Sequence, residues 1–229
     1  MATQLANDLF QNFVHIGHRT QKWNPKMKKY LYGELDGYHI INLEKTIDLL
    51  DIALQFLSKT SGEGKTILFV STKPQSMNLI KNVAQSCNMP YVASKWIPGL
   101  ITNYSTVKTR IKYLSDLKEQ AASGELDKYT KKEASQLKKN IAKLQIALGG
   151  VQKMTKAPDV VFVLDPVRDD IVVKEANKSK IPVVAFTDSN ADPDLIDYPI
   201  PANDDALKAL DFMLDKIAEA VKKPNKASK

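Results

Sequence analysis

Short apolar runs alternate with helix-like patterns along most of this chain. Nearly continuous apolar or β-like runs occur at 38–43, 66–70, 91–92, 160–164 and 183–186. Apolar residues at helical spacing occur at 3–13, 45–59, 74–87, 169–177 and 204–222. Runs without polar alternation are expected for strands covered on both sheet faces. Strands that alternate with helices predict a parallel sheet with right-handed crossovers, so we expect an α/β fold, doubly wound in three layers.

A different pattern occupies residues 101–156, between the third of these strand-like runs and the next. Two apolar stripes recur there at helical spacing. The first is Val107, Ile111, Leu114, Leu117 and Ala121, and the second, at spacings of three, four, three and four, is Ala134, Leu137, Ile141, Leu144 and Leu148. Such spacing is typical of a two-helix coiled-coil seam. Ser123 and Gly124 interrupt it, which predicts an inserted helical hairpin.

The sequence therefore divides into four predicted parts. They are an N-terminal helix and basic extended segment (1–37), an α/β domain (38–100 and 157–222), the inserted hairpin (101–156) and a disordered basic tail (223–229). We expect 17–37 to be irregular, because glycines and a proline interrupt any period. The single cysteine, Cys87, excludes an internal disulfide and favours a reducing compartment. No secretory signal or membrane span is expected.

Basic residues are concentrated in the hairpin. Residues 101–156 hold twelve Lys or Arg against five Asp or Glu, a difference equal to the +7 net charge of the whole chain. Residues 1–100 are also basic, with eleven against seven, whereas 157–229 are acidic, with ten against fourteen. This sorting predicts a polyanionic partner. The alternative is a coiled coil with ordinary solvated lysines.

A second basic segment, residues 17–30, holds five Lys or Arg together with Trp23 and Tyr30. Lys and Arg neutralise phosphates, and aromatic rings stack on bases, so this segment also predicts RNA binding. The alternative is a loop that Trp23 and Tyr30 pack onto the domain, with its lysines solvated. Both interpretations can hold together.

The motifs that suggest other chemistry are weak. Residues 61–66 resemble the end of a phosphate-binding loop, but Lys59 stands where its first glycine belongs and the loop precedes a strand, so we expect a simple turn. His15, His18 and Cys87 lack the spacing of a zinc site, and packing or an RNA contact by His18 is favoured.

A divalent ion is one interpretation of the aspartates at 188, 192, 194 and 197, but they lack the pattern of a calcium loop, and loop formation and capping are favoured. No nucleophile–base pair can be assembled from the sequence. We therefore predict no catalytic residue, no metal, no cofactor, no nucleotide site and no enzyme activity.

The chain resembles a known family, small-subunit ribosomal protein S-two of bacterial or organellar type, from about Phe10 to about Leu214. The matching pieces include Gly17-His18-Arg19-Thr20, Trp23-Asn24-Pro25-Lys26-Met27, His39-Ile40-Ile41-Asn42-Leu43, Leu100-Ile101-Thr102-Asn103 and Tyr198-Pro199-Ile200-Pro201-Ala202-Asn203-Asp204-Asp205. The chain departs from the family pattern where glycine is usual, at Ser71 and Pro98, and at Lys95, where arginine is usual. Asn42 and Ser189 also differ from the usual Asp and Thr.

The resemblance implies a flavodoxin-like domain with a protruding coiled-coil hairpin. It also implies a structural role in translation: binding to small-subunit ribosomal RNA between head and body, contacts with neighbouring small-subunit proteins, and docking of the messenger-binding protein S-one. The implied location is ribosome-bound in the cytoplasm, with an organellar matrix or stroma left open. The alternatives are an α/β enzyme for a phosphorylated ligand, with the hairpin as a lid, and a coiled-coil interaction module unrelated to RNA.

The residues predicted to contact RNA come from the basic segment, the approach to the hairpin and the hairpin itself. They are His18, Arg19, Lys22, Trp23, Asn24, Lys26, Lys28, Lys29, Lys95, Thr102, Asn103, Lys108, Arg110, Lys131, Lys132, Lys138 and Lys139.

Overall fold

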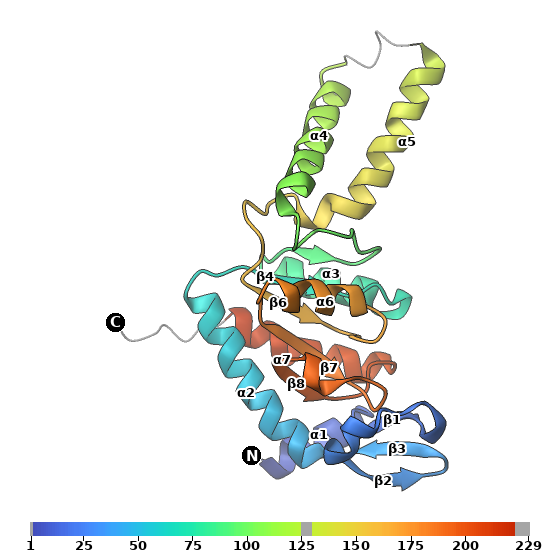
Figure 1. The fold of residues 1–229 in the computed structure, drawn as a ribbon, viewed down its shortest axis with the longest axis vertical. Helices are drawn as coiled ribbons and strands as arrows, with labels where there is room; N and C mark the ends of the chain where they lie inside the picture. The colour runs from blue at the N-terminus through green and yellow to red at the C-terminus, as the bar shows by residue number, and fades with distance from the viewer. Residues whose placement is uncertain (1, 125–129, 223–229) are drawn as a thin grey trace.

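A computed structural model describes residues 2–124 and 130–222. Its main sheet is parallel, with strand order β5-β4-β6-β7-β8 (Figure 1). The strands are β4 (Ile67–Val70), β5 (Tyr91–Val92), β6 (Val160–Val163), β7 (Val183–Thr187) and β8 (Tyr198–Pro201). Every residue of β4, β6 and β7 is buried, as their unbroken apolar sequences predict. In chain order the sheet runs second, first, third, fourth, fifth, which is the flavodoxin-like arrangement and confirms the predicted fold class.

Helices cover both faces of this sheet, so the domain has three layers. One face packs against α1 (Ala2–Gln11), α2 (Leu43–Gly62), α3 (Met77–Ser86) and α7 (Leu207–Lys222). The other packs against α6 (Asp170–Lys178) and the first turns of α4 (Tyr104–Ala122). The side chain of Phe69 packs on the first of these faces, and those of its neighbours Leu68 and Val70 pack on the second, as the alternation of side chains along a strand requires. Within residues 2–124 and 130–222, no helix is both long enough and apolar enough to span a membrane.

The basic N-terminal segment is more regular than the sequence suggested. Residues 17–37 were expected to be irregular, and the run from 38 to be a strand of the main sheet. Instead β1 (Ile16–Arg19), β2 (Leu31–Leu35) and β3 (Tyr38–Ile41) form a separate antiparallel sheet in the order β1-β3-β2. In β3 the buried residues His39 and Ile41 alternate with the less buried Tyr38 and Ile40, which is typical of an antiparallel sheet with one solvated face.

The helical hairpin is present, and it consists of α4 and α5 (Lys131–Leu148). It follows β5, which is the second strand of the parallel sheet and not the third, because β3 belongs to the other sheet. Four residues of the predicted α4 stripe are buried, namely Val107, Ile111, Leu114 and Leu117, whereas Ala121 in the last turn is exposed. A capping box between Thr130 and Glu133 starts α5, since each side chain bonds the other's backbone N–H.

Two helix starts differ slightly from expectation. The helix expected from Pro74 begins as a short 3-10 turn, Pro74–Ser76, before α3. The last helix begins at Leu207 because the Asn203 side chain accepts the backbone N–H groups of Asp205 and Ala206 in a preceding turn. The tip of the hairpin at 125–129 and the predicted disordered tail at 223–229 lie outside the described residues. The division into domains remains a prediction.

Candidate nucleic-acid interface

The basic N-terminal segment runs from β1 through two 3-10 turns, Thr20–Lys22 and Pro25–Tyr30, into β2. Asn24 fixes the second turn, because its side chain accepts the backbone N–H of Lys26 at 3.0 Å. Its own backbone N–H donates to the carbonyl of Ser189 at 2.8 Å, which ties the segment to the loop after β7. All five basic side chains of this segment are exposed. The four without a carboxylate partner in the described chain we call the N-terminal surface: Arg19, Lys22, Lys28 and Lys29.

Two of the residues predicted to bind RNA in this segment have partners within the protein. Trp23 is half-buried, and its ring lies against the buried His39, with centroids 4.8 Å apart. Lys26 is exposed but pairs with Asp192 at 2.8 Å and with Asp194 at 3.0 Å. The predicted packing role of Trp23 is therefore confirmed. Binding of RNA by Trp23 and Lys26 remains a prediction.

The predicted hairpin residues all lie on its solvent-facing sides. Lys108 and Arg110 are exposed on α4, and Lys131, Lys132, Lys138 and Lys139 are exposed on α5; together we call them the hairpin surface. Within 104–122 and 131–148, no Lys or Arg forms an ion pair with a carboxylate of the described chain. The charge of this surface is therefore available to an external anion.

The approach to the hairpin is ordered by a residue that the sequence interpretation missed. The carboxylate of Glu175 on α6 accepts the backbone N–H groups of Gly99 at 2.8 Å and Ile101 at 3.2 Å. It also accepts the backbone N–H and the hydroxyl of Thr102, at 3.3 and 3.2 Å. Thr102 thus has a structural partner, although its side chain remains exposed, as do Lys95 and Asn103. A lone glutamate in a helix gives no sequence signal for this role.

The predicted RNA-binding residues do not form one patch. Figure 1 shows the hairpin at one end of the molecule and the β1-β3-β2 sheet at the other, with the parallel sheet between them. The structure therefore separates the N-terminal surface from the hairpin surface. Any single RNA that contacts both has to extend along the long axis of the protein.

A buried charged cluster lies where β4, β6 and β8 end. Lys73 follows β4, and its side chain is only 8% exposed. Its ammonium group lies 2.8 Å from Asp204, 2.7 Å from Asp205 and 3.5 Å from Asp165. Burial alone would lower the pKa of Lys73, but these carboxylates outweigh it and raise the pKa, so the lysine is charged. Burial and the nearby carboxylates raise the pKa of Asp204 to about 7.

His18 joins this cluster from β1. Its Nδ1 lies 3.1 Å from Asp188, and its Nε2 lies 3.4 Å from Asp205. The Asp188 carboxylate raises the pKa of His18 to about 9, against the opposing effect of burial. One ligand atom each from His18, Asp188 and Asp204 lies within 4.8 Å of the others, so these three residues could hold a divalent cation. Our expectation that no metal binds remains a prediction.

Most of the aspartates considered as a possible cation site in the sequence have partners within the protein. Asp192 and Asp194 pair with Lys26, and Asp197 accepts the backbone N–H of Val183 at 2.8 Å. His15 stacks on Phe10, and within 2–124 and 130–222 it shares no potential metal group with His18 and Cys87. The sequence interpretation missed the cluster because its members are far apart in the chain. One signal was available: charged residues directly follow several strands at the carboxyl edge of the sheet.

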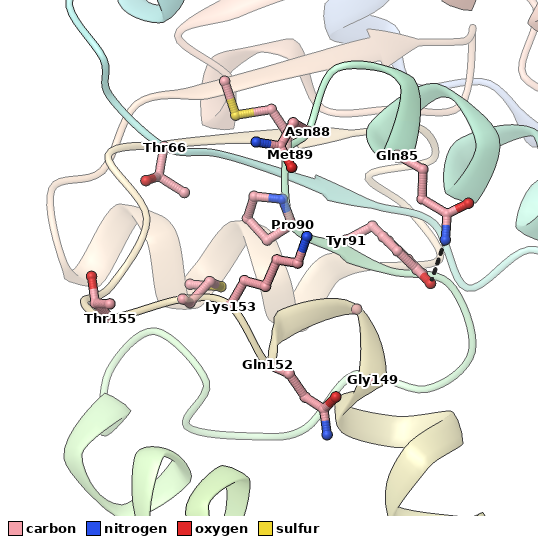
Figure 2. Close-up of a pocket in the computed structure, with 12 residues that line it drawn as sticks. Thr66, Gln85, Asn88, Met89, Pro90, Tyr91, Gly149, Gln152, Lys153 and Thr155 are labelled. Atoms are coloured by element: carbon pink, nitrogen blue, oxygen red, sulfur yellow. Dashed lines mark hydrogen bonds between the residues drawn. The ribbon is translucent and has the colours of Figure 1, made fainter. Parts of the chain in front are cut away.

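The turn that resembles a phosphate loop joins α2 to β4, as expected. A hollow of about 500 Å³ lies near it, at the base of the hairpin (Figure 2). Tyr91, Gln85 and Lys153 are among the residues that line it, and Gln85 donates to the Tyr91 hydroxyl at 3.4 Å. Within the described chain its lining contains no carboxylate, histidine or cysteine, and its polar side chains come from Thr, Gln, Asn, Tyr and Lys residues.

Comparison with known proteins identifies the family. The family described as Ribosomal protein S2 matches residues 9–224. The small ribosomal subunit protein uS2 of Campylobacter hominis is 45% identical over 214 residues, which cover 93% of this chain and 80% of that protein. The uS2 protein of Dictyoglomus thermophilum is 43% identical, over 96% of this chain and 90% of that protein. The uS2 protein of Dehalococcoides mccartyi is 39% identical, over 100% of this chain and 94% of that protein. The matched segment extends from α1 to the end of α7 and includes both basic surfaces, so this chain belongs to the ribosomal protein S2 family of the small ribosomal subunit.

Proposed function

We propose that this chain is a structural, non-catalytic component of the small ribosomal subunit that binds ribosomal RNA through two separate basic surfaces. The hairpin surface supplies phosphate contacts at one end of the molecule, and the N-terminal surface supplies them at the other. The observation that supports this most directly is the set of exposed Lys and Arg residues on α4 and α5 that form no ion pair within the described chain. Such residues release counterions from a nucleic-acid backbone, which is the main source of affinity for RNA.

The resemblance to the S-two family supports the finer parts of the proposal. They are a position between the head and body of the subunit, contacts with neighbouring small-subunit proteins, docking of protein S-one, and a ribosome-bound location in the cytoplasm. The family is one of ribosomal structural proteins, which disfavours the alternative of an enzyme with a helical lid.

The test is co-sedimentation with small subunits in a sucrose gradient, for the full chain and two quadruple variants. The first replaces Lys131, Lys132, Lys138 and Lys139 with Gln. The matched control replaces Lys59, Lys81, Lys178 and Lys180, which are also exposed but lie outside the hairpin. We expect the hairpin variant to leave the small-subunit fractions at lower salt than the control does. Absence of the unaltered chain from these fractions at moderate salt would contradict the proposal. S-one docking is tested separately, by measuring how much S-one co-sediments with subunits that contain this chain and with subunits that lack it.

A further inference from the structure

The outward face of the small antiparallel sheet carries a row of side chains that are not part of the hydrophobic core. Arg19 on β1 is paired with Tyr38 on β3, and Tyr38 is paired with Leu35 on β2. Residues directly opposite in antiparallel strands project from the same face. On the other face of β3, His39 and Ile41 are buried, whereas Tyr38 is 39% and Leu35 63% exposed. The row Arg19–Tyr38–Leu35 therefore faces away from the domain.

Arg19 and Tyr38 form an exposed pair within this row. The Arg19 Nε donates to the Tyr38 hydroxyl at 3.4 Å, and the guanidinium carbon lies 5.9 Å from the ring centroid. In the described chain Arg19 has no carboxylate partner. Guanidinium planes and tyrosine rings are the groups on which proteins stack unpaired RNA bases. Trp23, which the sequence favoured for stacking, already packs against His39.

A hollow of about 280 Å³ adjoins the pair. It is lined by Arg19, Thr20, Gln21, Asp36, Gly37 and Tyr38. Pockets for drug-sized ligands are usually about 300–1,000 Å³, so this one suits a single base better than a dinucleotide. Gln21 and Asp36 are exposed and can bond the edge of a base. A carboxylate accepts from a base amino group, which adenine, cytosine and guanine have and uracil lacks.

The charge around the sheet also suits a nucleic acid. Residues 16–41 hold five basic and two acidic side chains. One of the acids, Glu34, lies opposite His39 and 3.8 Å from its ring, away from the Tyr38 face. The other is Asp36 in the hollow, where a phosphate would be repelled but a base edge would be accepted. Lys22, Lys28 and Lys29 remain exposed for the adjoining phosphates.

We propose that this face binds one unpaired base of ribosomal RNA, stacked on Tyr38 and Arg19, with the amino group of the base bonded to Asp36. This inference rests on the proposed function, and it assigns the two ends of the protein different tasks. The hairpin surface neutralises backbone phosphates without regard to sequence, whereas the Tyr38 face reads a base.

The test uses single-stranded oligocytidine, oligoadenosine and oligouridine RNAs of about ten nucleotides, a length typical of single-strand sites. Binding to the full chain is measured by fluorescence anisotropy. We expect Tyr38→Ala to weaken binding of the cytidine and adenosine RNAs by about 5- to 150-fold, the range for loss of one stacked base. Tyr38→Phe keeps the ring and should bind like the original chain. Asp36→Ala should reduce binding of both RNAs to the level of oligouridine.

Tyr32→Ala is the matched control, because Tyr32 is an 82% exposed tyrosine of β2 that belongs neither to the Arg19–Tyr38–Leu35 row nor to the lining of the hollow. Circular dichroism verifies that each variant is folded. Equal affinities for Tyr38→Ala and Tyr32→Ala, or no binding of any oligonucleotide by the original chain, would overturn the inference. So would a Tyr38→Ala variant that fails to enter subunits while its oligonucleotide affinity is unchanged, since that face would then dock a protein. Co-sedimentation of the original chain reports independently on the proposed function.

Discussion

The indole Nε1 of Trp96 donates a hydrogen bond to Oε1 of Glu175 at 3.0 Å. This bond joins the segment after β5 to the middle of α6, across 79 positions of the chain. Together with the donors at Gly99, Ile101 and Thr102, it makes one carboxylate the anchor of the turn from which the hairpin starts. Gly99 lies in that turn with φ +89°, a conformation that glycine adopts without strain. The proline at position 98, where the family usually has glycine, is thus followed by a glycine that still allows the turn.

Glu175→Gln should destabilise the protein and change its response to acid. Burial would raise the pKa of Glu175, but the hydrogen bonds it accepts outweigh burial and lower the pKa. A lowered folded-state pKa means stabilisation that is present above the unfolded pKa and lost as pH falls through the folded value. We expect a loss of about 1–3 kcal/mol at neutral pH, because the partly buried N–H groups of Trp96, Gly99 and Ile101 lose their charged acceptor.

Urea unfolding between neutral pH and about pH 3 measures this effect, because the pKa of glutamate in an unfolded chain is about 4.3. The difference between the two proteins should shrink as the pH falls. Trp96→Phe removes one donor together with part of a buried ring, so it should also lower the stability but keep the pH dependence. A constant difference at every pH would show that the charge of Glu175 is unimportant.

Replacing the four hairpin lysines at 131, 132, 138 and 139 with Gln should flatten the salt dependence of RNA binding. Removing one lysine–phosphate interaction reduces the slope of log affinity against log salt by about 0.7–0.9. Filter binding of a small-subunit RNA fragment over a salt series gives this slope. The control variant at Lys59, Lys81, Lys178 and Lys180 should keep the original slope. An unchanged slope for the hairpin variant would mean that those lysines face only solvent.

Gly150→Ala should be strongly destabilising, whereas Gly149→Ala should be much milder. A Cβ at position 150 would collide with the backbone carbonyl of Tyr91 and come within 3 Å of its ring. At position 149 it would meet only the side chain of Gln145, which can move aside. Overpacking against a fixed group costs about 1–3 kcal/mol or more. Thermal unfolding of the two variants checks the order, and equal melting temperatures would refute the close approach at Gly150.

Lys73→Met should lower the free energy of unfolding by about 3–5 kcal/mol, the usual result of removing one partner from a buried charge cluster. The reason is that Asp204 and Asp165 would lose their common counterion in a buried site. The double variant with Asp204→Asn should recover part of the loss, because one uncompensated carboxylate is gone. A double-mutant cycle from chemical denaturation measures this coupling. Strictly additive losses would show that the two side chains do not interact.

Local patterns in the sequence were sufficient for much of the fold. The apolar runs that became β4, β6 and β7, and the spacing of three and four in the hairpin, are short-range signals of burial and periodicity, and the structure confirms them. The excess of basic residues in 101–156 is likewise a property of sequence alone. The family resemblance, read from motifs such as 17–20 and 198–205, is confirmed by the comparisons.

The tertiary structure decided which residues meet. From the sequence, Trp23 could bind RNA, pack on the domain or do both. In the structure its ring packs against His39 of β3, while Tyr38, which no motif singled out, faces outward. The cluster of His18, Lys73, Asp188 and Asp204 depends on crossovers that bring the ends of several strands to one edge. The contact of Glu175 with the turn before the hairpin likewise depends on where the chain path places α6. Contacts between residues far apart in the chain depend on topology and register, which hydrophobic periodicity does not encode.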